Sequence, residues 1–196
     1  MQKLKAKRYE DYGYVLDVFP ASQMRPSHGR VAVDRSEIIV HLLGEEFFTL
    51  LEAAVSERFK PQIGSRLYIG RDVPREILRI IRRIDFEELT ESGKSNLEPV
   101  IQKIVADNEA RFVEFFNKSN PITPRLHALE LIPGVGKKML QKFLEVREST
   151  PLTSFEDIRK KTGLLNPAEA ISKRILVEIV NKDEKYRVFV REPSPA

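Results

Sequence analysis

Residues 131–138 have the sequence LIPGVGKK, in which a proline and two glycines come directly before two lysines. Glycines permit the positive φ angles and the close backbone approach that a tight turn needs. If a helix begins just after the turn, its first backbone N–H groups have no partners within that helix. Such free donors attract an anion, and the helix dipole adds to the attraction. We therefore predict a phosphate contact formed by six residues: Pro133, Gly134, Val135, Gly136, Lys137 and Lys138.

The residues around this turn predict two short helices that pack against each other. Apolar side chains recur at helical spacing before and after it: Leu126, Leu129 and Ile132, then Met139, Leu140, Phe143 and Leu144. The arrangement resembles the helix–hairpin–helix motif of DNA- and RNA-binding proteins, whose P-G-apolar-G turn is matched by residues 133–136. Such a turn contacts the nucleic-acid backbone and gives no sequence preference. Two plainer interpretations remain open, a simple helix–helix connector and a protein-interaction module.

A second, weaker copy of the pattern follows. Phe155 and Ile158, and later Ile171 and Ile175, repeat the apolar spacing. The turn between these pairs, residues 162–168, has one glycine and lacks the second, so we expect it to be structural. Two such units bury a core that one alone could not. They predict a compact four-helix domain over residues 125–180.

A basic stretch lies earlier in the chain. From Arg58 to Arg83, eight basic residues accompany only Asp72 and Glu76, although the net charge of the whole chain is only +4. Such a segment is typical of nucleic-acid-binding proteins, and also of a heavily ion-paired surface. Five residues are candidates for extending the phosphate contact: Arg66, Arg71, Arg79, Arg82 and Arg83. Three tyrosines are candidates for base stacking or, more simply, for the core: Tyr12, Tyr14 and Tyr68.

Few residues suggest catalysis or metal binding. The chain has no cysteine, and His28, His41 and His127 show no metal-ligand spacing, so we expect no metal and no cofactor. Some DNA glycosylases have a catalytic aspartate beyond a comparable turn, and Asp157 follows Gly136 by 21 positions. The glycine-rich loop of those enzymes is missing, however, and Asp157 suits the first turn of a helix. We therefore expect no enzyme; a glycosylase- or nuclease-like activity remains an alternative.

The first half of the chain, which contains the basic stretch, is predicted to form mainly strands. Alternating apolar residues predict a strand over 12–20, and two β-branched runs predict a hairpin over 30–43. Residues 45–55 have helical spacing, whereas 65–70 and 76–84 suit strands. Several short strands with one inserted helix favour a small barrel of the OB (oligonucleotide-binding) kind.

The second half of the chain is predicted to be helical. Apolar residues over 95–116 follow one face of a helix of roughly six turns. The sequence NPITP then breaks the chain, and Thr123 could cap a helix that has Pro124 at its first position. The segment 185–191 suits a last strand, and 192–196 should be disordered. These boundaries give four parts: a barrel domain (1–90), a linking helix (91–120), the paired hairpin domain (121–182) and the tail (183–196).

Four stretches of the sequence are informative together: YVLDVFP, RRIDFEELT, NPITPRLHALELIPGVGKK and KYRVFV. They resemble an uncharacterised archaeal family of the domain-of-unknown-function 655 type. The resemblance covers nearly the whole chain. It implies a predicted RNA-binding protein with an OB-like barrel ahead of paired helix–hairpin–helix units. We therefore expect an α+β, non-catalytic nucleic-acid-binding protein, with RNA favoured over DNA by the resemblance alone. A protein-interaction adaptor is the other alternative. The N-terminus lacks the apolar stretch of a signal peptide, so we expect a cytoplasmic protein.

Overall fold

The computed structural model describes residues 9–24, 33–34 and 36–191. The chain divides into two compact units, which are described separately below. The sheet unit comprises residues 1–100 and 190–196, and the helical unit comprises residues 101–189. None of the described helices is both long and apolar enough to cross a membrane. The fold is α+β.

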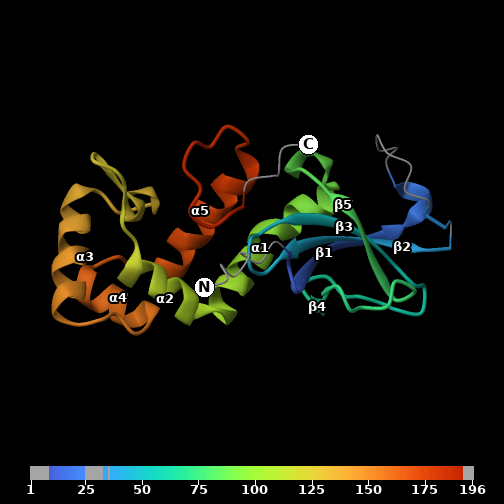
Figure 1. The fold of residues 1–196 in the computed structure, drawn as a ribbon, viewed down its shortest axis with the longest axis horizontal. Helices are drawn as coiled ribbons and strands as arrows, with labels where there is room; N and C mark the ends of the chain where they lie inside the picture. Colours follow the sequence, from blue (N-terminus) through green and yellow to red (C-terminus); the bar gives the residue numbers. More distant parts are fainter. Residues whose placement is uncertain (1–8, 25–32, 35, 192–196) are drawn as a thin grey trace, which may run out of the picture. The chain divides into compact units, whose positions relative to one another are not determined.

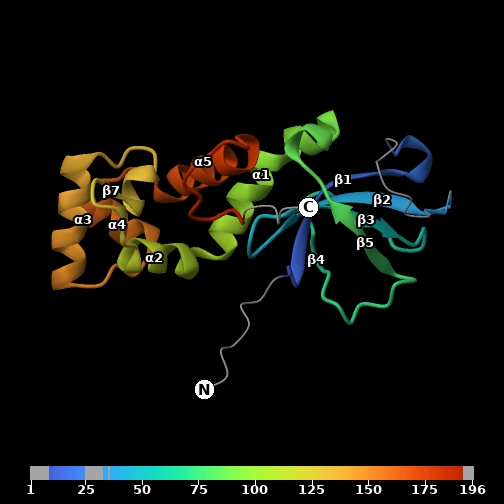
Figure 2. The ribbon, with the colours of Figure 1, turned by 45° about the horizontal axis from the view of Figure 1, so that its top comes forward.

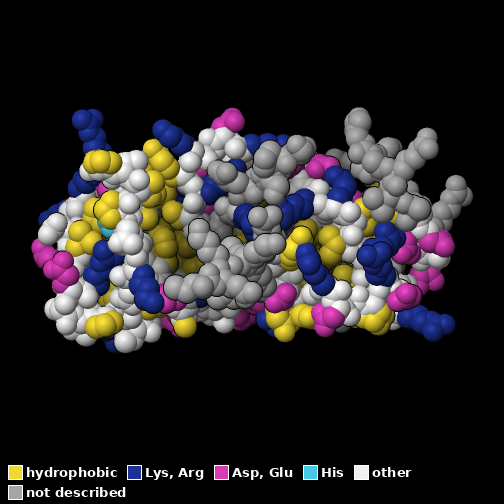
Figure 3. All heavy atoms as spheres, viewed as in Figure 1, with side chains coloured by type: hydrophobic (Ala, Val, Ile, Leu, Met, Phe, Trp, Pro, Cys, Tyr) yellow, Lys and Arg dark blue, Asp and Glu magenta, His cyan; other side chains and the backbone are white. Residues whose placement is uncertain are grey.

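The sheet unit is built on a five-stranded antiparallel sheet with the strand order β4-β1-β2-β3-β5 (Figure 1). The strands are β1 (Tyr12–Pro20), β2 (Ile38–Gly44), β3 (Leu50–Val55), β4 (Arg66–Tyr68) and β5 (Leu78–Arg83). The strands predicted near 12–20, 65–70 and 76–84 are confirmed. Over this sheet, Figure 3 shows Lys and Arg side chains standing next to apolar ones.

The predicted OB-like barrel is wrong, because the sheet is open. β4 and β5 are its two edges and do not pair with each other. β4 has only three residues, and the loop over 69–77 leads from it to β5 (Figure 2). Periodicity in the sequence predicts strands one at a time, and it contains no information on whether the first and last of them meet.

The helix expected over 45–55 is also wrong. All six residues of β3 are buried, so both of its faces are covered and the apolar–polar alternation typical of a half-exposed strand is missing. A tight turn precedes β3, and Phe48 has a φ of 53° there. The carboxylate of Glu10 holds this turn by accepting hydrogen bonds from the backbone N–H groups of Glu46, Phe47 and Thr49. Burial raises the pKa of Glu10. Of the hairpin predicted over 30–43, residues 30–32 and 35 lie outside the described residues, and the second of its two runs forms β2.

The division between the units falls within α1 (Glu91–Asp107), after two short 3-10 turns, η1 (Ala21–Gln23) and η2 (Phe86–Glu88). The elements that follow are α2 (Glu109–Lys118), β6 (Pro121–Thr123), β7 (Leu126–His127), η3 (Ala128–Leu131), α3 (Lys137–Ser149), α4 (Phe155–Thr162) and α5 (Pro167–Val180). In both views α2, α3 and α4 lie together (Figures 1 and 2).

Two helix predictions in this half need correction. The single helix expected over 95–116 is broken at Asn108, whose side-chain Nδ2 donates to the backbone oxygen of Ile104 at 2.9 Å. The helix expected after Pro124 is reduced to the 3-10 turn η3, and Thr123 lies in the short strand β6 instead of capping it. His127 occupies the N-cap position of η3.

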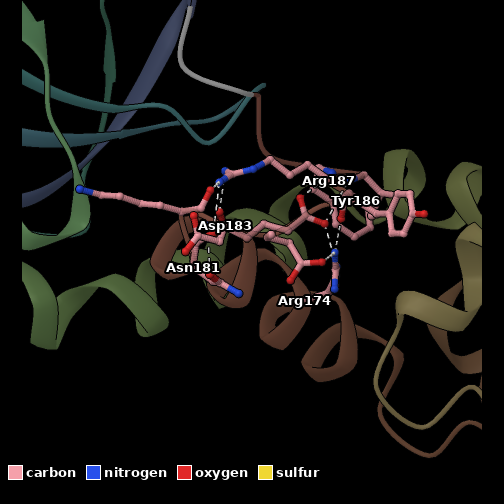
Figure 4. Close-up of polar contacts among 10 residues, drawn as sticks. Arg174, Asn181, Asp183, Tyr186 and Arg187 are labelled. Atoms are coloured by element: carbon pink, nitrogen blue, oxygen red, sulfur yellow. Dashed lines mark hydrogen bonds and ion pairs between the residues drawn. The ribbon is translucent and has the colours of Figure 1, made fainter. Parts of the chain in front are cut away.

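The segment after α5 packs on that helix and forms no strand over 185–191, contrary to prediction. Glu178 of α5 is fully buried, and its carboxylate accepts hydrogen bonds from Arg174 and from the backbone N–H groups of Val188 and Phe189. Figure 4 shows the surrounding contacts, in which Arg187 also donates to three backbone oxygens between 178 and 182. Residues 192–196, predicted to be disordered, lie outside the described part.

Candidate nucleic-acid interface

The turn over 133–136 brings the chain into α3 through two glycines with different roles. Gly134 has a φ of 90°, a conformation that favours glycine, and a Cβ there would lie 3.3 Å from Cδ1 of Leu164. Gly136 is the N-cap of α3, with a φ of −90° and a ψ of −178°. A Cβ at Gly136 would meet no atom within 4 Å among the described residues. The space next to the start of α3 is therefore open.

The backbone donors at the start of α3 are unused. The N–H group of Val135 donates to the oxygen of Ile132 at 3.0 Å, and the N–H group of Leu140 donates to Gly136 at 2.8 Å. Between them, the N–H groups of residues 136–139 have no hydrogen-bond acceptor in the described part of the chain. The first turn of α3 contains no acidic residue, and Gly136, Lys137 and Lys138 are exposed. This geometry suits an anion.

The two lysines of the turn differ. The Nζ of Lys137 pairs with Glu130 at 2.7 Å and donates to the backbone oxygen of Arg125 at 3.1 Å. The hydrogen bond from Lys137 lowers the pKa of Glu130. Lys138 is exposed and forms no ion pair with any described residue. The sequence suggested two mobile charges at this place, and the structure supplies one.

A buried histidine positions the turn from the other side. Nδ1 of His127 accepts a hydrogen bond from the N–H group of Leu129 at 3.1 Å, and Glu130 accepts one from the N–H group of His127 at 2.8 Å. These two bonds close η3, which leads directly into the turn. Burial lowers the pKa of His127, and the nearby charge of Arg147 lowers it further.

The second turn, over 163–166, supports the first. Gly163 ends α4 with a φ of 88°, and the next residue, Leu164, is buried against Gly134 of the first turn. Asp157 belongs to the first turn of α4, where its Oδ2 accepts a hydrogen bond from the N–H group of Thr153 and pairs with Lys161, each at 3.0 Å. The ion pair lowers the pKa of Asp157.

A groove of about 1510 Å³ lies in the sheet unit, where the two edges of the open sheet leave a gap. Its lining includes Tyr68 of β4, residues of the loop over 69–77 and most of β5. Five arginines line it: Arg71, Arg75, Arg79, Arg82 and Arg83. Three acidic side chains do so as well: Glu10, Asp11 and Asp72. Among the lining residues themselves, arginines therefore outnumber acidic side chains.

The arginines of this groove differ in whether an acidic side chain pairs with them. Arg79 pairs with Glu37 at 3.1 Å, and Arg82 pairs with Glu52 of β3 at 2.9 Å and with Glu88 at 2.5 Å. The guanidinium of Arg71 lies 3.6 Å from the ring centroid of Tyr9. Arg75 and Arg83 are exposed and have no ion-pair partner among residues 9–24, 33–34 and 36–191. Four of the five predicted arginines thus come together.

Arg66, the fifth, does not line the groove. Both ends of its guanidinium donate to the carboxylate of Glu45, at 2.9 and 2.8 Å, and it stacks 3.4 Å from the ring centroid of Tyr12. The hydrogen bond that Arg66 donates to Glu45 is the main cause of the raised pKa of Arg66. Its donors are already used in a bidentate pair, so Arg66 is a poor candidate for a phosphate contact.

The three tyrosines have different surroundings. Tyr14 is buried, which confirms the simpler prediction that it belongs to the core. Tyr12 is half-buried and packs edge-on against Tyr68. Tyr68 is 45% exposed and donates its hydroxyl to Asp72 at 2.5 Å, a hydrogen bond that raises the pKa of Tyr68 to about 12. Only Tyr68 of the three combines exposure with a place in the groove.

Among the aromatic and basic residues of the groove, Tyr9 and Arg75 are the two that were not candidates from the sequence. Both lie outside the strands, and the path of the loop over 69–77 could not be predicted from periodicity. The one available signal was that Arg75 belongs to the basic stretch. Among the described residues, no group of three or more His, Asp or Glu side chains is placed to hold a metal ion.

Comparisons with known proteins place the chain in a family. The family model described as a protein of unknown function, DUF655, matches residues 9–191. An uncharacterised protein of Methanocaldococcus jannaschii is 38% identical over 192 residues, which cover 97% of this chain and 84% of that protein. The crystal structure of Af1531 from Archaeoglobus fulgidus, assigned to the same family, is 39% identical, with a TM-score of 0.78. That similarity covers 93% of this chain and 100% of the other. The chain belongs to the DUF655 family.

Proposed function

We propose that this protein binds nucleic acid without sequence preference, through a phosphate contact at the turn 133–138. The observation on which this depends is the row of unused N–H groups over 136–139, exposed and beside open space. No acidic side chain of α3 competes for these donors, and Lys138 adds a positive charge next to them. The turn presents backbone donors and no side chain shaped to a base edge, so it holds the phosphate and does not select a sequence.

The interpretation of residues 125–180 as two helix–hairpin–helix units belongs to this proposal. In the first unit the leading helix is shortened to η3, and the second unit has its buried turn residue Leu164 against Gly134. RNA is the first ligand to test, because the sequence resemblance favours it over DNA. The proposal assigns no catalytic role to any residue.

The test uses Lys138→Glu, with binding of a fluorescent single-stranded RNA measured by anisotropy. A glutamate in the first turn favours the helix dipole, so α3 should be no less stable. The same glutamate covers the free amides with negative charge, and we expect affinity to fall by about tenfold or more, which corresponds to roughly 1.4 kcal/mol. Gly136→Val is a second variant, because its extended backbone and open surroundings accept a side chain that would obstruct the same amides.

Lys103→Glu is the matched control. It makes the same change of charge on an exposed face of α1, far along the chain from the turn, and breaks only an exposed pair with Asp107 that contributes little to stability. Affinity for this variant should stay within about a factor of two, as expected for one screened surface charge. If Lys138→Glu binds as tightly as Lys103→Glu, the turn is not the contact. A protein-interaction adaptor would then be the better account.

A further inference from the structure

We infer that the groove between the edges of the open sheet holds a single strand of nucleic acid, with bases against its aromatic and apolar side chains. This inference rests on the proposed function, since it names the kind of nucleic acid, but it concerns residues of the sheet unit alone. The groove of about 1510 Å³ is larger than pockets for small molecules, which are typically about 300–1,000 Å³. An extended ligand fits such a groove.

Positive charge in the groove is available to a ligand. Arg75 and Arg83 have no ion-pair partner in the described part of the chain, and both are exposed. Among the acidic residues, Glu10 holds the turn before β3 and Asp72 accepts a hydrogen bond from the hydroxyl of Tyr68. The lining has five arginines and three carboxylates, so the backbone of a strand lying in this groove would meet more arginines than carboxylates.

The aromatic groups distinguish a single strand from a duplex. Tyr9 and Tyr68 are 53% and 45% exposed, and Ile80 of β5 is 37% exposed between groove arginines. Exposed rings and an apolar surface beside arginines form a stacking platform for bases. In a duplex the faces of the bases are covered by their neighbours, so only an unpaired strand can use this platform. An acidic peptide would satisfy the arginines but would leave the tyrosine faces without a matching partner.

The experiment compares the double variant Arg75→Glu/Arg83→Glu with Arg58→Glu/Lys60→Glu. Both change the charge of the sheet unit equally, and residues 58 and 60 are exposed outside the groove. Anisotropy would be measured with a fluorescent single-stranded RNA and with a fully paired duplex of the same length. We expect the groove variant to bind the single strand about tenfold more weakly than its control, while the two bind the duplex equally. Tyr9→Ala should show the same selective loss without a change of charge.

Equal binding of the single strand by the groove variant and its control would overturn the inference, as would an equal loss on the duplex. So would displacement of the RNA by a poly-glutamate peptide as effectively as by unlabelled single strand. The proposed function has a separate readout, because Lys138→Glu should weaken both single strand and duplex. If only the groove variants lose binding, the turn fails and the groove stands. If only Lys138→Glu loses binding, the groove fails and the turn stands.

Discussion

His127 is the residue on which the position of the candidate phosphate contact most depends. Its Nδ1 must carry no proton to accept the hydrogen bond from Leu129, and that bond helps to close η3 just before the turn. Burial and the nearby Arg147 lower the pKa of His127 below its ordinary value of 6.5. The folded protein therefore binds fewer protons than the unfolded chain at pH values below 6.5. The stabilising contribution of neutral His127 is complete above pH 6.5. It is lost as the pH falls from 6.5 to the lowered pKa of His127 in the folded protein.

The variant His127→Asn tests this account of the histidine. Asparagine offers an oxygen to the same N–H group, as a good N-cap does, but has no titrating proton. We expect the free energy of unfolding of the wild type to fall more between pH 7 and pH 5 than that of the variant. Chemical denaturation at several pH values would measure the difference. Equal pH dependence in the two proteins would contradict the role given to His127.

Among the elements, α5 holds the segment after it in part through a buried carboxylate. Glu178 accepts a hydrogen bond from Arg174 and two more from backbone N–H groups of the following segment. Arg174 also pairs with Glu184 at 3.0 Å, so its charge stays partly compensated without Glu178, and the loss of the hydrogen bonds to a charged group costs about 1.5–3 kcal/mol. We therefore predict that Glu178→Gln lowers the free energy of unfolding by an amount of this order.

The matched control for Glu178→Gln is Glu169→Gln on the same helix. Glu169 also pairs with a basic residue four positions away, Lys173, but the pair is exposed. Exposed pairs contribute little, so this variant should unfold almost like the wild type. Urea denaturation of the two variants measures both effects. If they unfold alike, the buried carboxylate does not hold the segment in place.

The elements also show what the sequence could and could not predict. Alternation identified β1, and the β-branched content of 76–84 identified β5, because each strand has its own local signal. β3 was mistaken for a helix because both of its faces are buried. The turn glycines of 134 and 136 were recognised from local sequence, whereas the ion pair of Lys137 with Glu130 was not anticipated. The groove depends on the gap between two sheet edges, which no local pattern contains.

The net charge of the whole chain is only +4, but two local features favour the same class of ligand. The helical unit has the unused amides beside Lys138, and the sheet unit has the arginine-lined groove. In the proposed function both features would act on phosphate through charge and hydrogen bonds, so both should release counterions when nucleic acid binds. Two phosphate contacts, one in each unit, would both make the strength of binding depend on salt.

The most direct measurement is therefore a salt titration of binding by the wild-type protein, with two single-stranded RNAs of unrelated sequence. We predict that both bind, with similar affinities, and that log K falls linearly as log salt rises. Each contacted phosphate contributes a slope of roughly −0.7 for a single strand, and a total of about −2 or steeper is expected for several contacts. An affinity that does not change with salt, binding of one sequence only, or no binding at low salt would contradict the account.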